Sequence, residues 1–364
     1  MKTIMMILLP LVLLNACNVR KAKYAESEAV SLLRSELAHA ARNGILFGHQ
    51  DDLAYGIGWK EEPGESDVKR TAGDYPALFG WEIGHVGDST NIDGVPFASM
   101  VHYIQEVHRM GGVNTISWHA RHPVSGNSSW TLNDIDIKAL LPEGKAHEQF
   151  KASLDKVAVF ISQLTDDRGE LIPVIFRPWH EMYGGWFWWG STTCSNEDYI
   201  ALFRFTVDYL RNEKGLNNLL MAYSPDSGAD TPEKYLSRYP GDDVVDLLGI
   251  DNYGDYQIER LDQVVQKLSM VVELAAAKNK LAAFTETGCD RLEIDQWYTS
   301  NLLQVLRANE HTRSLAYVMV WRNRDEDHFY VPYPGHAQAE DFKSFADDGL
   351  ILLLEKYRKA KEEL

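Results

Sequence analysis

Eight short runs of apolar, β-branched and aromatic residues recur along the chain, and this repetition constrains the fold more than any other feature. Within each run the apolar residues are continuous rather than alternating with polar ones, which is typical of parallel strands covered on both faces. The sequence therefore predicts a parallel sheet of eight strands. The runs are 45–50, 77–85, 112–120, 171–179, 218–226, 244–253, 281–288 and 315–323.

Segments with helical periodicity separate most of these runs. In the third of them Asn196 is expected to be the N-cap and Gly215 the C-terminal stop. Strand–helix units that repeat eight times in about 350 residues predict an α/β fold, a single (β/α)8 TIM barrel. The alternative is an open doubly wound sheet, although no GxGxxG motif follows the first run. The helical segments are 97–112, 147–164, 196–215, 257–280, 295–309 and 340–363.

The first residues of the chain resemble an export signal. Residues 1–16 hold one Lys and an apolar run too short to cross a bilayer as a mature helix. The sequence LNAC at 14–17 resembles the lipobox of bacterial lipoproteins, in which Cys17 is lipidated after cleavage; a plain secretory peptide is the alternative. We therefore expect a lipoprotein signal peptide over 1–16, a short tether over 17–24 and one large domain over 25–364.

The residues that follow Cys17 are basic rather than acidic. In some bacteria, lipoproteins exported to the cell surface share an acidic run directly after the lipidated Cys. This chain lacks such a run, which favours a location at the periplasmic face of the outer membrane. The cell surface and secretion are the alternatives. We expect a monomer that touches the membrane only through its lipid anchor.

The charge of the chain limits the ligands that it can bind. A formal net charge of −17 argues against nucleic acid, whose binders need a basic face, and it is equally unfavourable for anionic polysaccharides. Aromatic residues make up 11% of the chain, which favours a neutral ligand recognised by aromatic faces. Cys194 and Cys289 could form a disulfide in an oxidising compartment, but the sequence leaves this open.

Polar and aromatic residues follow several of the predicted strands. In a TIM barrel the catalytic groups lie at the C-terminal ends of the strands, where the loops to the helices begin. A purely structural pattern would not require such residues at one rim of the barrel. They are Glu82, His85, Trp118, His119, His180, Glu181, Asp251, Tyr253, Glu286, Trp321 and Arg322.

Two of these rim residues suit glycoside hydrolysis, which needs one protonated and one ionised carboxyl group at the scissile bond. Glu181 and Glu286 follow the fourth and seventh strands, so they can converge across the mouth of a closed barrel. The tryptophans after Glu181 are expected to desolvate it and raise its pKa, which suits the acid/base. Tyr253 is expected to donate to Glu286 and keep it ionised, which suits the nucleophile.

The tryptophans at the rim are candidate platforms for sugar rings, whose C–H faces pack on indoles. We expect at least two of them to be packing residues instead, because Trp is usually well buried. His119 and His180 are candidates for reading sugar hydroxyls, with a structural role as the alternative. The candidate platforms are Trp118, Trp186, Trp188, Trp189 and Trp321.

Other chemistries fit the sequence less well. Zinc hydrolysis can be imagined from His49, Asp51 and Asp52 together with His119 and His122, but no HxH or HExxH spacing supports it. A serine nucleophile lacks the GxSxG motif. We therefore predict no metal and no cofactor.

Six motifs resemble the family 26 glycoside hydrolases, and they run in that family's order from about residue 40 to the C-terminus. The motif FRPWHEMYGGWFWWG at 176–190 is the most specific of them. The resemblance implies a (β/α)8 barrel, a retaining double-displacement mechanism and, for most members, endo-β-1,4-mannanase activity. The other motifs are FGHQDDLAYGIGW at 47–59, SWHARHPVSGNSSW at 117–130, GIDNY at 249–253, TETG at 285–288 and VWRN at 320–323.

The same resemblance implies roles for individual residues. Glu181 is implied as the acid/base and Glu286 as the nucleophile, in agreement with their expected environments. Trp186 is implied on the leaving-group side of the scissile bond. The remaining implied sugar-binding residues are His119, His180, Tyr253, Trp321 and Arg322, with Asp251 and Trp118 as further candidates.

We therefore predict a retaining glycoside hydrolase that cleaves β-1,4-mannosidic linkages in mannan, galactomannan or manno-oligosaccharides. Cleavage inside the polymer and mannobiose release from an end both stay open, as does tolerance of galactose branches. A β-glucanase (lichenase) or a β-1,3-xylanase of the same family is the alternative activity. An alternative from another class is a non-catalytic glycan-binding lipoprotein that uses the same aromatic cleft.

Overall fold

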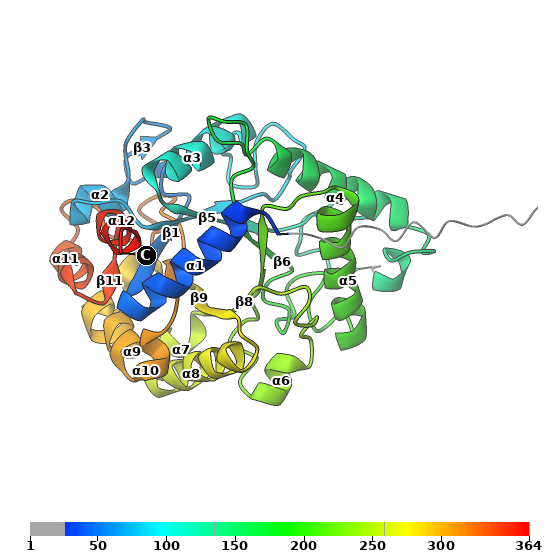
Figure 1. Cartoon of the computed structure of the whole chain (residues 1–364). Coiled ribbons are helices and arrows are strands. Elements are labelled where there is room, and N and C mark those ends of the chain that lie inside the picture. Colours follow the sequence, from blue (N-terminus) through cyan, green and yellow to red (C-terminus); the bar gives the residue numbers. More distant parts are fainter. Residues whose placement is uncertain (1–25, 134–135, 258, 364) are drawn as a thin grey trace, which may run out of the picture.

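The computed structural model describes residues 26–133, 136–257 and 259–363, which form one barrel surrounded by helices (Figure 1). The predicted signal peptide over 1–16, the tether over 17–24 and Cys17 lie outside the described residues.

Eight parallel strands form the closed barrel, and each falls within one of the eight predicted runs. The ring closes where β10 pairs with β1, with His49 opposite Val320. This pairing confirms the (β/α)8 barrel, and the open doubly wound sheet is wrong. The strands are β1 (Ile45–Gln50), β4 (Leu78–Glu82), β5 (Val113–Trp118), β6 (Val174–Pro178), β7 (Leu219–Tyr223), β8 (Leu247–Asn252), β9 (Leu281–Thr287) and β10 (Tyr317–Val320).

The outer helices follow five of the six predicted segments closely. The first residue of α5 is Asn196, and Ser195 is its N-cap, because the Ser195 hydroxyl accepts the N–H of Asp198. The N-cap prediction was therefore wrong by one residue. The long helices are α3 (Phe97–Met110), α4 (His147–Ser162), α5 (Asn196–Asp208, continued by a π-helical turn over Tyr209–Glu213) and α8 (Leu261–Ala277). The fifth segment folds as a π-helical turn (Trp297–Leu302) and α9 (Leu303–Arg307).

The predicted closing helix over 340–363 is wrong in one respect, because the structure breaks it in two. Helix α11 (Ala339–Asp347) and helix α12 (Leu354–Lys361) are separated by a two-residue strand, β11 (Ile351–Leu352). This strand pairs with the first residues of β1, where Ile45 lies opposite Ile351. The continuous apolar run after Gly349 favours a buried strand over another helical turn.

Short elements complete the loops. Strands β2 (Tyr55–Gly56) and β3 (Trp59–Lys60) form a hairpin after β1. The short helices are α2 (Asp67–Ala72), α6 (Pro232–Leu236), α7 (Gly254–Gln257) and α10 (Glu310–Arg313), with 3-10 turns at Ile137–Ala139 and Asp290–Leu292.

Helix α1 (Glu28–Asn43), which the sequence analysis did not predict, covers the end of the barrel where the strands begin (Figure 1). Its buried Val30, Leu33, Leu37 and Ala40 pack against apolar residues from the starts of the strands. This end is therefore closed by apolar packing. The opposite end, where the strands finish, is left to form a binding site.

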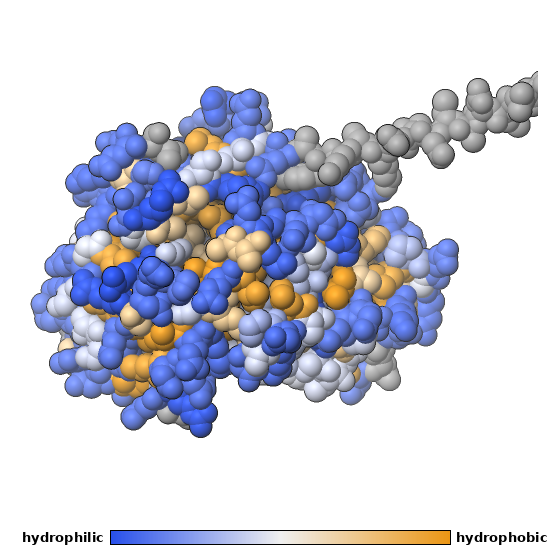
Figure 2. All heavy atoms as spheres, turned by 60° about the horizontal axis from the view of Figure 1, so that its bottom comes forward, coloured by the Kyte–Doolittle hydropathy of each residue, from blue (hydrophilic) through white to orange (hydrophobic). Residues whose placement is uncertain are grey.

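The outer surface is mostly hydrophilic on the face shown in Figure 2, with apolar residues gathered near its middle. Within residues 26–133, 136–257 and 259–363 no helix is both long and apolar enough to cross a bilayer.

Candidate active site

A cleft of about 350 Å³ lies at the C-terminal ends of the strands. Seven of the predicted site residues line it: Glu181, Glu286, His119, Trp186, Tyr253, Trp321 and Arg322. They come from five different strand ends, which the closed barrel brings together. The convergence of these residues is what the sequence predicts for a barrel enzyme.

The end of β6 carries Glu181 into the cleft through an unusual backbone. Trp179 and Glu181 are both left-handed, each with φ of 55°, on either side of His180. The N–H of Glu181 donates to the carbonyl of Ser224 at 2.8 Å, which holds the conformation. Trp179 is fully buried in the core, whereas Glu181 lines the cleft. Backbone strain of this kind persists where the surrounding structure fixes it, and it is concentrated at functional sites.

Trp186 is 43% exposed, and its indole N–H donates to Glu181 Oε2 at 2.8 Å. This position depends on Gly184, because a Cβ added there would lie 2.3 Å from the Trp186 ring. Asp226 fixes the same turn by accepting the N–H groups of Tyr183 at 2.9 Å and Gly184 at 2.7 Å. The loop after β6 is therefore built to hold an indole against the carboxyl group of Glu181.

The pKa of Glu181 is raised well above its usual value. Burial is the largest cause, followed by the negative charges of Glu286 and Asp251, while the hydrogen bond from Trp186 opposes the shift. A carboxyl group in this position retains its proton at a pH where an exposed Glu has lost it. Glu181 is therefore suited to donate a proton.

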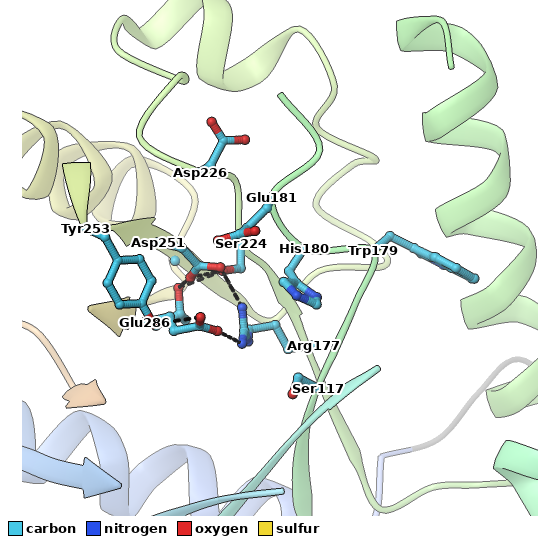
Figure 3. A network of polar contacts seen from close by, with 12 residues as sticks. Ser117, Arg177, Trp179, His180, Glu181, Ser224, Asp226, Asp251, Tyr253 and Glu286 are labelled. Atoms are coloured by element: carbon cyan, nitrogen blue, oxygen red, sulfur yellow. Dashed lines mark hydrogen bonds and ion pairs between the residues drawn. The ribbon is translucent and has the colours of Figure 1, made fainter. Parts of the chain in front are cut away.

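Glu286, at the end of β9, is surrounded by donors. The Tyr253 hydroxyl donates to Glu286 Oε1 at 2.8 Å, and the guanidinium of Arg177 donates to Oε2 (Figure 3). Burial and the charge of Glu286 raise the pKa of Tyr253 well above its usual value, so the phenol remains a donor. These contacts fix the position of the Glu286 carboxyl group at the wall of the cleft.

Asp251 was predicted as a sugar ligand, but it lies beneath the cleft and does not line it. It is 2% exposed and accepts from Arg177 at 2.6 Å and from the hydroxyls of Ser224 and Thr285 at 2.7 Å each (Figure 3). Its oxygen atoms are used inside the protein, because Asp251 is the second carboxylate partner of the buried Arg177. The structure therefore places Asp251 as the support of Arg177, and direct contact with the sugar stays a prediction.

His119 and His180 lie together, with ring centres 4.7 Å apart, but only His119 lines the cleft. Glu82, which is fully buried, accepts from His119 Nδ1 at 2.7 Å and from the Ser117 hydroxyl at 2.7 Å. Burial would raise the pKa of Glu82, but the charge and hydrogen bonds of His119 lower it overall. The ionised carboxylate therefore orients the imidazole of His119 toward the cleft.

His180 is 1% exposed and does not line the cleft, so its predicted contact with the sugar stays a prediction. Burial and the neighbouring charge of Arg177 lower its pKa well below the usual value for histidine. A neutral ring that supports the floor of the cleft, behind His119, is consistent with this environment.

Three of the five candidate tryptophan platforms are packing residues: Trp118, Trp188 and Trp189, each 3% exposed or less. Trp188 donates to the carbonyl of Ala120 at 2.9 Å and Trp189 to that of His180 at 2.8 Å, so their indole N–H groups are satisfied in the core. Their rings surround Trp179. The expectation that at least two would be packing residues is confirmed, and Trp186 and Trp321 remain in the cleft.

Sequence reasoning missed several residues of the cleft. Trp130 stacks on His119 with ring centres 5.4 Å apart, and Asp93 forms an ion pair with Arg322. The end of the motif at 117–130 pointed to Trp130, whereas no pattern distinguished Asp93 from other loop residues. The remaining lining residues are Ile92, Phe187, Gln257, His328 and Tyr330.

The residues considered for zinc hydrolysis are engaged in other ways. His49 Nδ1 lies 2.7 Å from Asp52 Oδ1, and Asp51 accepts the hydroxyl of Tyr55 at 2.7 Å. Within the described part of the chain, no three His, Cys, Asp or Glu side chains are placed to hold a metal. Cys194 and Cys289 are both buried and both free, so the structure does not contain the disulfide that the sequence left open.

A closed barrel with two carboxyl groups of opposite character in one aromatic cleft is the arrangement of a glycoside hydrolase. The chain belongs to glycosyl hydrolase family 26, whose model matches residues 23–327.

Proteins from several bacteria are similar to this chain. A mannan endo-1,4-beta-mannosidase of Bifidobacterium adolescentis is 34% identical over 94% of this chain, which spans about a third (36%) of that protein. One from Bacillus subtilis is 30% identical over 70% of this chain and 69% of its own length. The structure of a GH26 beta-mannanase from Bacteroides ovatus is similar with a TM-score of 0.87 and 41% identity, covering 91% of this chain and 96% of that one.

Proposed function

We propose that the protein is a retaining endo-β-1,4-mannanase in which Glu181 is the acid/base and Glu286 is the nucleophile. The observation that carries this proposal is the contrast between the two carboxyl groups of one cleft. Glu181 has a raised pKa, while Glu286 receives hydrogen bonds from Tyr253 and Arg177. The mannanase names of the relatives support mannan as the substrate.

In the first step Glu286 attacks the anomeric carbon while Glu181 gives its proton to the oxygen of the leaving sugar. Formation of the glycosyl ester removes the negative charge of Glu286. Because that charge helps to raise the pKa of Glu181, the pKa of Glu181 then falls. The lower pKa keeps Glu181 ionised after it has given up its proton, so it can accept a proton from the attacking water. Hydrolysis of the ester then completes the reaction with net retention.

The aromatic residues of the cleft would hold the sugar chain on either side of this point. Trp186, which follows β6, would pack against the leaving-group sugar, and Trp321, which follows β10, would lie beneath the glycone. Arg322 and His119 would bind hydroxyl groups. Arg322 is paired with Asp93 and His119 with Glu82, so the cleft offers polar contacts without a large net charge. This balance suits a neutral polysaccharide.

The test is the stereochemistry and pattern of products from unbranched manno-oligosaccharides, followed by NMR and by product length over time. We expect β-anomers to appear first and products of several lengths from the earliest time points. Immediate α-anomers would contradict the double displacement, and mannobiose alone from the start would indicate end-acting cleavage. Faster turnover of mixed-linkage β-glucan or β-1,3-xylan would favour the alternative activities. If no sugar is released from any of these glycans, the non-catalytic glycan-binding lipoprotein remains as the explanation.

We also propose that the protein is an exported lipoprotein, anchored through Cys17 at the periplasmic face of the outer membrane, and a monomer. The lipobox-like sequence at 14–17 supports this proposal. Labelled palmitate should enter the wild-type protein and not a Cys17→Ser variant. Protection from added protease in intact cells distinguishes the periplasmic face from the cell surface. The molar mass of the domain over 25–364, measured by light scattering without detergent, tests whether it is a monomer.

A further inference from the structure

A second pocket, of about 380 Å³, lies between the loop after β8 and the loop after β9. We call it the side pocket. Its lining includes Tyr256 and Gln257 from the first loop and Asp290, Arg291, Glu293 and Ile294 from the second. Gln257 lines both this pocket and the cleft, so the two spaces adjoin at that residue.

The order of the strands places the side pocket beside the path of the sugar chain. Trp186 follows β6 and Trp321 follows β10, and these strands are opposite one another in the closed ring β10–β9–β8–β7–β6–β5–β4–β1. The cleft therefore runs from β6 to β10, with β7, β8 and β9 forming one wall. The side pocket belongs to this wall, in the half toward β10.

The chemistry of the side pocket suits a neutral ligand with hydroxyl groups. Arg291 is paired with Glu293 at 2.5 Å, and its Nε lies 3.8 Å from Asp290, so each carboxylate of this loop has a cation beside it. Gln257 makes no side-chain hydrogen bond to another described residue, which leaves its amide available. Tyr256 is 1% exposed, and its hydroxyl has no partner among the described residues.

The loop after β9 is held in a shape that keeps the pocket open. Arg291 and Leu292 are consecutive non-glycine residues with φ of 55° and 51°. The N–H of Arg291 donates to the carbonyl of Phe329 at 2.8 Å, and the buried amide of Gln338 donates to the carbonyls of Leu292 and, at 2.9 Å, Ile294. Neighbouring segments therefore fix this strained turn, as is typical of binding loops.

We propose that the side pocket receives a single neutral sugar branch carried by a backbone unit on the glycone side of the cleavage point. This proposal rests on the proposed mannanase function and extends it to a substrate class, a β-mannan with one-sugar branches. The branch would leave the backbone sugar beside Glu286 and Tyr253 and pass Gln257. Its hydroxyls would meet the amide of Gln257 and the charged pairs of the loop.

The experiment fills the pocket without touching the cleft. Glu293 is exposed and lines only the side pocket, so Glu293→Trp should occupy the space of the branch. We compare kcat/KM on unbranched manno-oligosaccharides with kcat/KM on the same backbone carrying one α-1,6-galactosyl branch. The variant should lose about tenfold on the branched substrate, while its value on the unbranched substrate stays within about twofold. Glu148→Trp, on α4, is the matched control, because Glu148 is also exposed and paired with a nearby cation, Lys151 at 3.5 Å.

Products of the wild-type enzyme provide a second measurement that needs no variant. Mass spectrometry of a galactomannan digest should find branched units close to the new reducing ends, and Glu293→Trp should remove these products. An equal effect of Glu293→Trp on both substrates, or no effect on either, would overturn the proposed role of the side pocket in binding a branch. The proposed mannanase function would remain. The absence of branches near the new reducing ends of wild-type products would overturn it as well. A wild-type enzyme that cleaves neither substrate would instead remove the proposed function.

Discussion

The two ends of the barrel are built from different interactions. At the closed end, α1 places Val30, Leu33 and Leu37 against the first residues of the strands, and the contacts are apolar. At the open end, Trp179 and Glu181 have left-handed backbones, and Glu181 carries a pKa well above its usual value. Apolar packing at the closed end increases the free energy of unfolding. The strained and desolvated groups at the open end decrease it.

This difference indicates where stability and activity can be changed separately. Apolar burial at the closed end contributes to folding and lies far from the reacting atoms. Groups at the open end keep a geometry that the isolated chain segments would not choose, so the rest of the barrel must hold them in place. Substitutions at the closed end should therefore alter the melting temperature, and substitutions at the open end should alter the rate of catalysis.

The strongest test of this separation is Glu181→Ala, with Glu286→Ala as its companion. Each should lower kcat by about a thousandfold or more, since each removes a group that acts in the transition state. Kinetics on unbranched manno-oligosaccharides measure the loss. Azide should restore turnover of Glu181→Ala on substrates with good leaving groups and form a β-azide, whereas with Glu286→Ala it should give the α-azide.

The stability of a Glu181→Gln variant sharpens the same comparison. Because the folded protein raises the pKa of Glu181 above its usual 4.5, its contribution to the free energy of unfolding becomes less favourable as the pH rises above that value. The variant should melt at the same or a higher temperature than the wild type at pH 8. A clearly lower melting temperature of the variant at pH 8 would contradict the view that burial of the Glu181 carboxyl group decreases the free energy of unfolding.

Leu37→Ala tests the closed end. Leu37 is fully buried beneath the barrel, and truncation should lower the free energy of unfolding by about 2 to 5 kcal/mol. Urea denaturation measures this loss. At a temperature where the variant is folded, kcat/KM should stay within about twofold of the wild type; a large fall would mean that the two ends are coupled.

Glu82→Gln tests a residue that acts through another one at the open end. The change keeps the shape of Glu82 but removes the charge that orients His119, so kcat/KM should fall by about 10-fold to 100-fold. Because the pKa of Glu82 is lowered, its carboxylate contributes stability above its unfolded pKa, and that contribution is lost as the pH falls. The variant should therefore differ from the wild type more at pH 7 than at pH 4 in urea denaturation.

The sequence was informative where a single physical rule decides the outcome. All eight strands were predicted, since buried parallel strands must be continuously apolar, and strand ends such as Glu181 and Glu286 followed from the barrel. The break in the predicted closing helix was not predicted, because the pairing of Ile351 with β1 is a tertiary contact between residues far apart in the sequence. Helix α1 was missed although its apolar spacing was present.

The site was predicted less completely because burial cannot be read from residue type. Trp118 and Trp186 are equally aromatic, but only the fold shows that one packs in the core and the other lines the cleft. The same applies to His119 and His180, which differ in whether a carboxylate partner holds the ring at the surface of the cleft. Asp93 lies in a loop, so its pairing with Arg322 depends on the path of that loop in space.

The smallest expected effect concerns a single hydrogen bond at the open end. Trp186→Phe keeps an aromatic face but removes the N–H that donates to Glu181 Oε2 at 2.8 Å. This hydrogen bond lowers the pKa of Glu181 against the stronger effects of burial and of Glu286, so its loss should raise that pKa further. Since Glu181 must be protonated for the first step, the basic limb of the kcat/KM profile should move to higher pH. A shift to lower pH would show that Trp186 acts on Glu181 chiefly by excluding water, and the contrast between the two ends would then rest on desolvation alone.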